Sequence, residues 1–284
     1  MKIAIASGKG GTGKTTIATN LAASITAGAT LLDCDVEEPN AHLFLQPDFE
    51  RCTPVEVFVP AIDPDRCTGC RACVDSCRFN ALTAVGRQIL VFPELCHSCR
   101  GCQVVCPEDA VSEDRRTIGW IESAQRQELQ LIQGRMRVGE AMAPPLIQAV
   151  QQGVTTAGEV IIDAPPGTSC PVIATIKAAD FVVLVTEPTP FGLHDLKLAV
   201  AVVKSLEIPS GIVINRSDIG DDAVIDYGAE HNLEILLQIP YDPAIASAYS
   251  RGLLLVEQDQ RYQLVFEKLL ARIEKRLQTA VGSI

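Results

Sequence analysis

Eight cysteines in two strings carry the most specific chemistry in this 284-residue chain. Each string has the spacing C-x2-C-x2-C-x3-C, and each cysteine of the second string follows its counterpart by 29 residues. Closely spaced thiolates bind iron–sulfur clusters or zinc, and in oxidising compartments they form disulfides. The constant offset indicates an internal duplication. The first string is Cys67, Cys70, Cys73 and Cys77, and the second is Cys96, Cys99, Cys102 and Cys106.

A glycine-rich loop near the start of the chain predicts phosphate binding. It follows a short apolar strand and opens a helix, so backbone N–H groups and the positive helix N-terminus can both face phosphate oxygens. We expect Lys14 to contact the β- and γ-phosphates and the Thr15 hydroxyl to bind Mg²⁺. A second lysine, Lys9, is unusual inside such a loop. The loop consists of Gly8, Lys9, Gly10, Gly11, Thr12, Gly13, Lys14, Thr15 and Thr16.

The cysteine segment resembles a bacterial-type ferredoxin with two 4Fe-4S clusters. Its third cysteine disfavours zinc, because a tetrahedral zinc site draws on two separated pairs, whereas C-x2-C-x2-C surrounds three corners of a cubane. Pro107 follows Cys106 as the ferredoxin pattern expects, but Arg78 follows Cys77, and we expect this departure to affect the local backbone and the potential. The ligand sets that the resemblance implies are Cys67, Cys70, Cys73 and Cys106 for one cluster, and Cys96, Cys99, Cys102 and Cys77 for the other.

Composition excludes several other classes of protein. A hydrophobic content of 47% predicts a folded chain with one large α/β core and a small insert. A net charge of −11 disfavours a general nucleic-acid binder, which needs a basic face. No segment has the pattern of a signal peptide or a membrane span, so we expect reduced thiols in the cytoplasm.

Apolar strands alternate with amphipathic helices outside the cysteine segment. This alternation predicts an α/β fold with a mostly parallel sheet covered on both faces and a ligand edge at the carboxyl ends of the strands. We assign residues 1–60 and 112–284 to this fold and residues 61–111 to an inserted α+β ferredoxin-like domain. Strands are expected at 3–6, 30–33, 160–162, 181–185, 211–214 and 235–239, a helix at 14–27, and a helical stretch from Ile121.

Outside the insert, the chain resembles the MinD/ParA superfamily of P-loop ATPases, which includes the Mrp-type cluster carriers and the nitrogenase iron protein. The family loop, K-G-G-x-G-K followed by two hydroxyl residues, matches Lys9 to Thr16. The resemblance implies that Lys9 reaches the nucleotide of a partner subunit in an ATP-sandwiched dimer, either a homodimer or a heterodimer with a related ATPase. The layout also resembles the subgroup of this superfamily that contains an inserted ferredoxin.

Two further segments match the switch regions of this superfamily. Asp33 and Asp35 match the D-x-D of the first switch, in which Asp35 would organise the attacking water and contribute to the Mg²⁺ site. A helix-capping role is the alternative for Asp35. The segment from Val160 to Gly167 matches the second switch: Asp163 would hold Mg²⁺ through water, and Gly167 would move when the γ-phosphate leaves.

The resemblance also predicts the base-binding residues. Asn215 would lie against adenine, and Pro240 would begin a loop that packs on the base. Asn215, Arg216 and Asp218 also fit the N-K-x-D pattern with which GTPases select guanine, although Arg216 replaces the lysine. The family favours ATP.

The remaining cysteines and the C-terminal segment have weaker signals. We expect Cys34 and Cys52 to be small buried hydrophobes. Cys170 follows the second switch and is a candidate for redox coupling. The apolar positions at 263–277 favour a helix packed on the core over a membrane-binding helix, because acidic residues interrupt its polar face.

These observations predict a cytoplasmic, dimeric ATPase whose nucleotide-driven switches control electron transfer through two 4Fe-4S clusters to a redox partner. Two alternatives stay open. One is an iron–sulfur cluster carrier of the Mrp type that serves client proteins, and the other is a MinD-like positioning ATPase whose clusters sense redox state. No nucleic-acid partner and no stable membrane insertion are expected.

Overall fold

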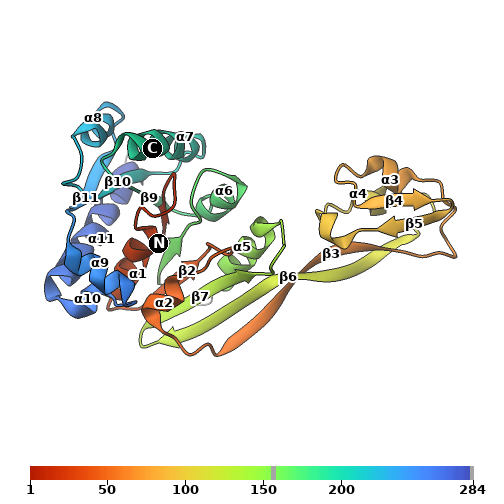
Figure 1. Cartoon of the computed structure of the whole chain (residues 1–284), viewed down its shortest axis with the longest axis horizontal. Coiled ribbons are helices and arrows are strands. Elements are labelled where there is room, and N and C mark those ends of the chain that lie inside the picture. The colour runs from red at the N-terminus through yellow and green to blue at the C-terminus, as the bar shows by residue number, and fades with distance from the viewer. Residues whose placement is uncertain (155–157, 282–284) are drawn as a thin grey trace.

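The computed structural model describes residues 1–154 and 158–281. Figure 1 shows an α/β body and a smaller lobe, joined by a long ribbon of two antiparallel strands, β3 and β6. β3 (Arg51–Ile62) leads from the body to the lobe, and β6 (Val111–Arg126) leads back. The lobe therefore consists of one continuous segment, residues 63–110, at the far end of the ribbon.

A nine-stranded sheet organises the body, in the order β11-β10-β9-β1-β8-β2-β7-β6-β3. The pairs from β11 to β7 are parallel, whereas β6 pairs antiparallel with both β7 and β3. The predicted α/β fold with a mostly parallel sheet is thus confirmed. The other strands of this sheet are β1 (Lys2–Ala6), β2 (Ala29–Asp33), β7 (Leu129–Met136), β8 (Glu159–Asp163), β9 (Phe181–Thr186), β10 (Ser210–Asn215) and β11 (Glu234–Ile239).

Helices cover both faces because the central strands are apolar on both sides. In β1, Ala4 packs in a core with α5, α6 and α7, whereas Ile3 and Ile5 pack in the opposite core with α1 and α11. The helices of the body are α1 (Lys14–Ser24), α2 (Ala41–Leu45), α5 (Ala143–Gln152), α6 (Cys170–Ile176), α7 (Pro190–Ser205), α8 (Ala223–Glu230), α9 (Pro243–Ser250), α10 (Leu255–Gln258) and α11 (Gln260–Val281).

The C-terminal helix packs on the body as expected. Phe266, Leu269 and Ile273 of α11 are buried in the same core as Leu21 of α1. Across the described ranges, none of the helices combines the length and the apolar character that a membrane span requires.

The predicted helical stretch from Ile121 is wrong. Ile121 lies in β6, which continues to Arg126, turns at Gln127 in a left-handed conformation and returns as β7. β6 pairs with β3 from Val111 to Ser123 and with β7 from Gly119 to Arg126, and these ladders outweigh any local helical pattern. The helix predicted at 14–27 ends at Ser24, because the chain becomes extended at Ile25 before the turn at Gly28.

The lobe repeats one backbone conformation twice. Each cysteine string leads into a short helix, α3 (Ala72–Ser76) or α4 (Gly101–Val104), and a hairpin of β4 (Leu82–Val85) and β5 (Gln88–Val91) separates the two strings. Left-handed backbone conformations recur at positions 29 residues apart, which extends the duplication from the sequence to the chain path. The matching positions are Gly69 and Ser98, Arg71 and Arg100, and Asn80 and Asp109.

Candidate functional site

The phosphate loop and both acidic segments meet at one edge of the sheet. β8 lies between β1 and β2, and all three strands are parallel. The loop after β1, Asp33 at the end of β2 and Asp163 at the end of β8 therefore converge, as expected for the ligand edge of an α/β sheet. Asp33 and Asp163 face each other in register across the β2–β8 pair.

The phosphate loop adopts a conformation that depends on glycine. Gly13 caps the N-terminus of α1 with a φ of 93°, a left-handed value that side chains rarely adopt. The Asn215 amide donates to the Thr12 carbonyl at 2.9 Å, and a Cβ on Gly13 would lie 2.7 Å from that amide nitrogen. Lys14 Nζ donates to the Lys9 carbonyl at 3.4 Å, so its ammonium is held within the loop.

Thr15 and Asp163 form the oxygen-rich corner of the site. The Thr15 hydroxyl donates to Asp163 Oδ2 at 2.6 Å. Asp163 Oδ1 is buried without a hydrogen-bond partner among the described residues, so it is available to a ligand. Burial, and then the nearby Asp33 carboxylate, raise the pKa of Asp163 well above its usual value. A cation would relieve this cost, and hydroxyl and carboxylate oxygens are the donors that Mg²⁺ prefers, so these residues fit Mg²⁺.

The two aspartates of the first switch have different surroundings. Asp33 is fully buried and accepts hydrogen bonds from the backbone N–H groups of Asp35, Asn40 and Ala41, at 3.1, 2.9 and 2.9 Å. Burial, with the charge of Asp35, raises the pKa of Asp33 to about 7, against the effect of those hydrogen bonds. Asp33 thus holds the switch loop and the start of α2. The capping alternative for Asp35 stays open, because the backbone N–H of Glu38 also acts to lower the pKa of the Asp35 carboxyl.

Asp35 borders a cavity beside the phosphate loop. Burial raises the pKa of Asp35 to about 6, while the Lys14 ammonium opposes this shift and neighbouring glutamates reinforce it. Burial also lowers the pKa of Lys14, against the attraction of Asp163 and Asp35. These pKa shifts come from burying one ammonium with several carboxylates, a cluster of charges that phosphates and a divalent cation would complete.

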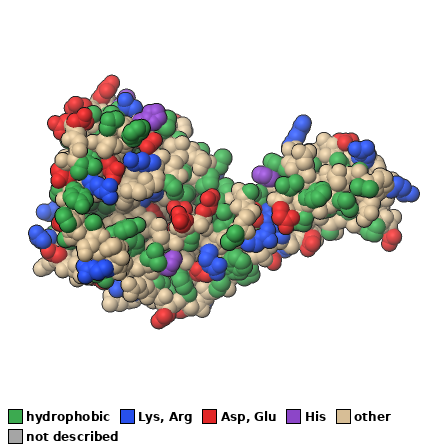
Figure 2. All heavy atoms as spheres, in the orientation of Figure 1, with side chains coloured by type: hydrophobic (Ala, Val, Ile, Leu, Met, Phe, Trp, Pro, Cys, Tyr) green, Lys and Arg blue, Asp and Glu red, His purple; other side chains and the backbone are tan. Residues whose placement is uncertain are grey.

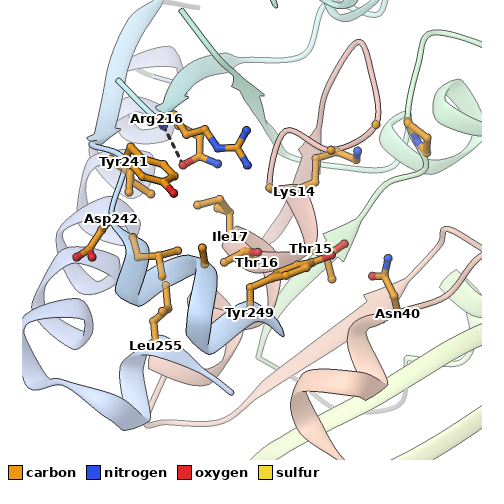
Figure 3. Close-up of a pocket in the computed structure, with 18 of the residues that line it drawn as sticks. Lys14, Thr15, Thr16, Ile17, Asn40, Arg216, Tyr241, Asp242, Tyr249 and Leu255 are labelled. Atoms are coloured by element: carbon orange, nitrogen blue, oxygen red, sulfur yellow. Dashed lines mark hydrogen bonds between the residues drawn. The ribbon is translucent and has the colours of Figure 1, made fainter. Parts of the chain in front are cut away.

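A cavity of about 460 Å³ extends from the phosphate loop toward β10 and β11. Figure 3 shows Lys14, Thr15 and Thr16 on one side of it and Tyr241, Asp242 and Leu255 on the other. Its length and its change from polar to apolar lining suit a nucleotide, with the phosphates at the loop and the base at the far end. The predicted residues that line this cavity are Gly10, Gly11, Gly13, Lys14, Thr15, Thr16, Asp35, Asn215, Arg216 and Pro240.

Gly8 and Gly167 support the loop from outside the cavity lining. Gly8 packs against the backbone of Asp195 in α7, where a side chain would clash. Gly167 has a φ of 96°, and its N–H donates to the Ser7 carbonyl at 3.1 Å. The segment predicted to be the second switch is thus hydrogen-bonded directly to the residue that follows β1 and begins the phosphate loop.

One residue of the site, Glu187, was missed in the sequence. It follows β9 and its side chain is 9% exposed. Its carboxylate lies 3.4 Å from Lys9 Nζ and 3.0 Å from Arg216 Nη1, so it pairs with both cations. An acidic residue directly after a fully buried strand was the signal that could have identified it.

The four cysteines assigned to the first cluster border one small cavity in the lobe: Cys67, Cys70, Cys73 and Cys106. Burial raises the pKa of the Cys73 thiol, and the neighbouring Cys106 and Cys67 raise it further. The backbone N–H of Ala110 donates to Cys106 Sγ at 3.3 Å, an interaction that stabilises a thiolate ligand. The lobe therefore brings the fourth cysteine of the second string to the first three cysteines of the first.

The second string shows the reciprocal arrangement. Burial raises the pKa of Cys96, as do the nearby Cys99 and Cys77, and burial followed by the proximity of Cys96 raises the pKa of Cys102 to about 11. The N–H of Ser98 donates to Cys96 Sγ at 3.4 Å. In the part of the chain that the structure describes, no three His, Cys, Asp or Glu side chains close around a single metal ion. The donor type, the exchanged fourth cysteine and the N–H···S contacts fit 4Fe-4S clusters.

The three cysteines outside the strings differ in exposure. Cys34 is buried as expected, and burial raises its pKa well above the usual value. Cys52 is exposed on the ribbon, so its predicted burial is wrong, because β3 is an edge strand of the sheet. Cys170 is exposed at the start of α6.

The parallel sheet, the glycine loop and the carboxylates at its ligand edge define a P-loop nucleotide-binding protein. Residues 3–256 match the CobQ/CobB/MinD/ParA nucleotide binding domain family. The chain belongs to this family.

Relatives and solved structures are similar to this chain over most of its length. An uncharacterized protein of Methanocaldococcus jannaschii is 33% identical, over 89% of this chain and 90% of its own length. An iron-sulfur cluster carrier protein of the same organism is 25% identical, over 98% of this chain and 85% of its own length. The septum site-determining protein MinD of Pyrococcus horikoshii, solved with Mg-ADP, has a similar fold, with a TM-score of 0.60 at 18% identity over 96% of each chain.

Proposed function

We propose that this chain is an ATPase in which nucleotide-driven movement of two switch segments controls a lobe that holds two 4Fe-4S clusters. The observation that carries the proposal is the lobe itself: four cysteines from both strings border one cavity, at the end of a ribbon that is part of the nucleotide-binding sheet. Bound clusters would supply one-electron transfer to or from a redox partner.

The residues of the nucleotide site have separate roles in this proposal. Lys14 and the loop N–H groups bind the phosphates, and the Thr15 hydroxyl and Asp163 provide oxygens for Mg²⁺. Asp35 orients the attacking water, while Asp33 holds the switch loop in place. Gly167 moves when the γ-phosphate is lost, and this movement would break the hydrogen bond from its N–H to the Ser7 carbonyl.

The far end of the cavity supports ATP over GTP. In the guanine-binding pattern the carboxylate at the position of Asp218 would face the base. Here Asp218 Oδ1 accepts the N–H of Tyr241 at 2.6 Å, and the Arg216 side chain turns to Glu187. Asn215 and the loop that begins at Pro240 are left to contact adenine.

The proposal is tested by redox titration, followed by electron paramagnetic resonance, of the anaerobically purified protein without nucleotide, with ADP and with ATP trapped by Asp35→Ala. The protein is expected to contain about eight iron and about eight sulfide per chain. Nucleotide should shift the midpoint potential by about 40 to 130 mV, the equivalent of a coupling free energy of about 1–3 kcal/mol. Identical midpoints in all three states would contradict control by nucleotide.

A cluster carrier is the second candidate, because relatives named iron-sulfur cluster carrier protein align with almost the whole chain. The two functions differ in how firmly the clusters are held. A carrier should transfer its clusters to an apo-protein acceptor within minutes, whereas eight thiolate ligands in exchanged sets, six of them buried or partly buried, should retain them. Rapid, ATP-dependent transfer with unchanged midpoints would favour the carrier.

A further inference from the structure

We infer that Arg116 and Glu140 form a strut through which the nucleotide switches position the Cys96 loop of the lobe. The inference rests on the proposed function, since it names the residues that would connect its two halves. It arises from one buried ion pair at the neck of the molecule, where Figure 2 shows basic and acidic side chains gathered between the body and the lobe.

The ion pair is buried and has several partners. The Arg116 and Glu140 side chains are 8% and 1% exposed, and the guanidinium contacts both carboxylate oxygens. Arg116 Nη2 lies 3.2 Å from Glu140 Oε1 and also donates to the Cys96 carbonyl at 3.4 Å. A single guanidinium thus links the body to a predicted cluster ligand of the lobe.

Glu140 attaches this link to α5. Its Oε1 accepts the backbone N–H groups of Ala141 and Met142, each at 3.1 Å, directly before the helix begins at Ala143. Because those N–H groups belong to the start of α5, a shift or rotation of the helix would move the carboxylate and, with it, the Arg116 guanidinium.

Helix α5 also lies close to the first switch loop and contacts α6, the helix that follows the second switch. A Cβ on Gly134 of β7 would lie 2.6 Å from Val36 and 2.9 Å from Val150, so α5, β7 and the first switch loop pack tightly together. The Val36 carbonyl accepts the Met136 N–H at 2.8 Å. On its other side, Gln151 donates to the Thr175 carbonyl at 2.7 Å in α6, the helix that follows the second switch.

The Cys96 loop also contacts the ribbon, and within the lobe the His97 ring stacks on the Phe79 ring with centroids 3.7 Å apart. Ser98 Oγ donates to the Phe58 carbonyl at 2.8 Å, and the Arg100 guanidinium lies over the Phe58 ring. Ser98 and Arg100 thus attach the Cys96 loop to the ribbon, whereas Arg116 and Glu140 join the loop to α5, the helix that we expect to respond to nucleotide. Substitution of Arg116 or Glu140 can therefore remove the link to α5 and leave the contacts between the Cys96 loop and the ribbon in place.

The test uses Arg116→Lys, which keeps the charge but cannot contact Glu140 and the Cys96 carbonyl together. A second variant, Arg116→Met with Glu140→Gln, leaves no unpaired buried charge and guards against misfolding of the first. The control is Arg126→Met. Arg126 forms a two-bond ion pair with Glu257 between the same strand and the body, away from the cysteines.

Hydrogen–deuterium exchange of amides 96–105 is measured on cluster-loaded protein with and without a non-hydrolysable ATP analogue. In the wild type and in Arg126→Met, we expect the analogue to change exchange by about fivefold or more. In both strut variants this change should be lost, while affinity for the analogue and iron content are retained. An undiminished response in the strut variants overturns the strut and leaves the proposed function intact. If the analogue does not change amide exchange in the wild-type lobe, both the strut and the proposed function are overturned.

Discussion

Asp33 and Asp35 belong to one short sequence pattern, but their side chains have different roles. Asp33 is buried against three backbone N–H groups, and Asp35 lines the cavity beside Lys14. The pattern D-x-D identified the segment, but only the path of the chain between β2 and α2 shows which carboxylate supports the loop. The roles of Asp33 and Asp35 depend on the direction of the backbone after β2, and the D-x-D spacing does not specify that direction.

Lys14→Ala and Asp35→Ala should therefore fail in different ways. Lys14 contacts ground-state phosphates, so Lys14→Ala should abolish ATP binding. Asp35→Ala should keep binding and lower hydrolysis by about 10²-fold or more, because it removes the group that orients the water. Binding of a fluorescent ATP analogue and release of phosphate measure the two effects. The exposed Asp48 supplies a control in Asp48→Ala, and normal turnover of Asp35→Ala would remove Asp35 from catalysis.

Substitution of Glu187 should increase a property of the protein, its ATP-dependent dimerisation. It holds Lys9 within its own subunit, whereas the proposed dimer needs Lys9 at the partner's nucleotide. Glu187→Gln should free Lys9 and strengthen ATP-dependent dimerisation by up to about fivefold, the effect of a partly exposed ion pair of about 1 kcal/mol. Sedimentation at several concentrations measures this effect. Glu187→Asp, which keeps the charge, should resemble the wild type, and a weaker Glu187→Gln dimer would show that the pair supports the active position of Lys9.

At the scale of elements, the sequence was most informative where strands are buried on both faces. The apolar runs at Ile3, Val160 and Phe181 all lie in central parallel strands. The ribbon was missed because β6 carries charged and polar residues over most of its exposed length, and β3 and β6 are stabilised by pairing with each other. Cross-strand pairing between segments about sixty residues apart leaves no local periodicity to detect.

Substitution of Gly119 tests how tightly β6 packs against β7 and α5. A Cβ at this position would lie 2.6 Å from the Arg135 carbonyl and 2.7 Å from Leu146 of α5. Gly119→Ala should therefore destabilise the protein by about 1–3 kcal/mol, because neither the backbone of β7 nor the packed helix can yield cheaply. Thermal unfolding measures the change. Asp114→Ala, at an exposed position of the same strand, should stay within about 0.5 kcal/mol of the wild type.

At the scale of the whole molecule, the ribbon makes the lobe an extension of the nucleotide-binding sheet. β7 pairs with β2, which carries the first switch, and β6 and β3 continue the same sheet toward the lobe. The insert at 61–111 was predicted from the change from α/β alternation to closely spaced cysteines, and it stays a prediction. In the structure β3 ends at Ile62 and β6 begins at Val111. Spacing could not predict that the two units share a sheet rather than a flexible linker.

Lys9→Ala addresses the assembly of two such molecules. If each Lys9 reaches the nucleotide of its partner, Lys9→Ala removes one cation from each of two composite sites. ATP-dependent dimerisation and ATPase activity should then fall together, while ATP binding to the single chain is retained through Lys14 and the loop N–H groups. Analytical ultracentrifugation with ATP, performed on Asp35→Ala and on Asp35→Ala with Lys9→Ala, separates dimerisation from turnover. Lys2→Ala, at an exposed lysine outside the loop, is the matched control. A Lys9→Ala chain that dimerises like its parent would place the action of Lys9 within its own subunit, where Glu187 already holds it.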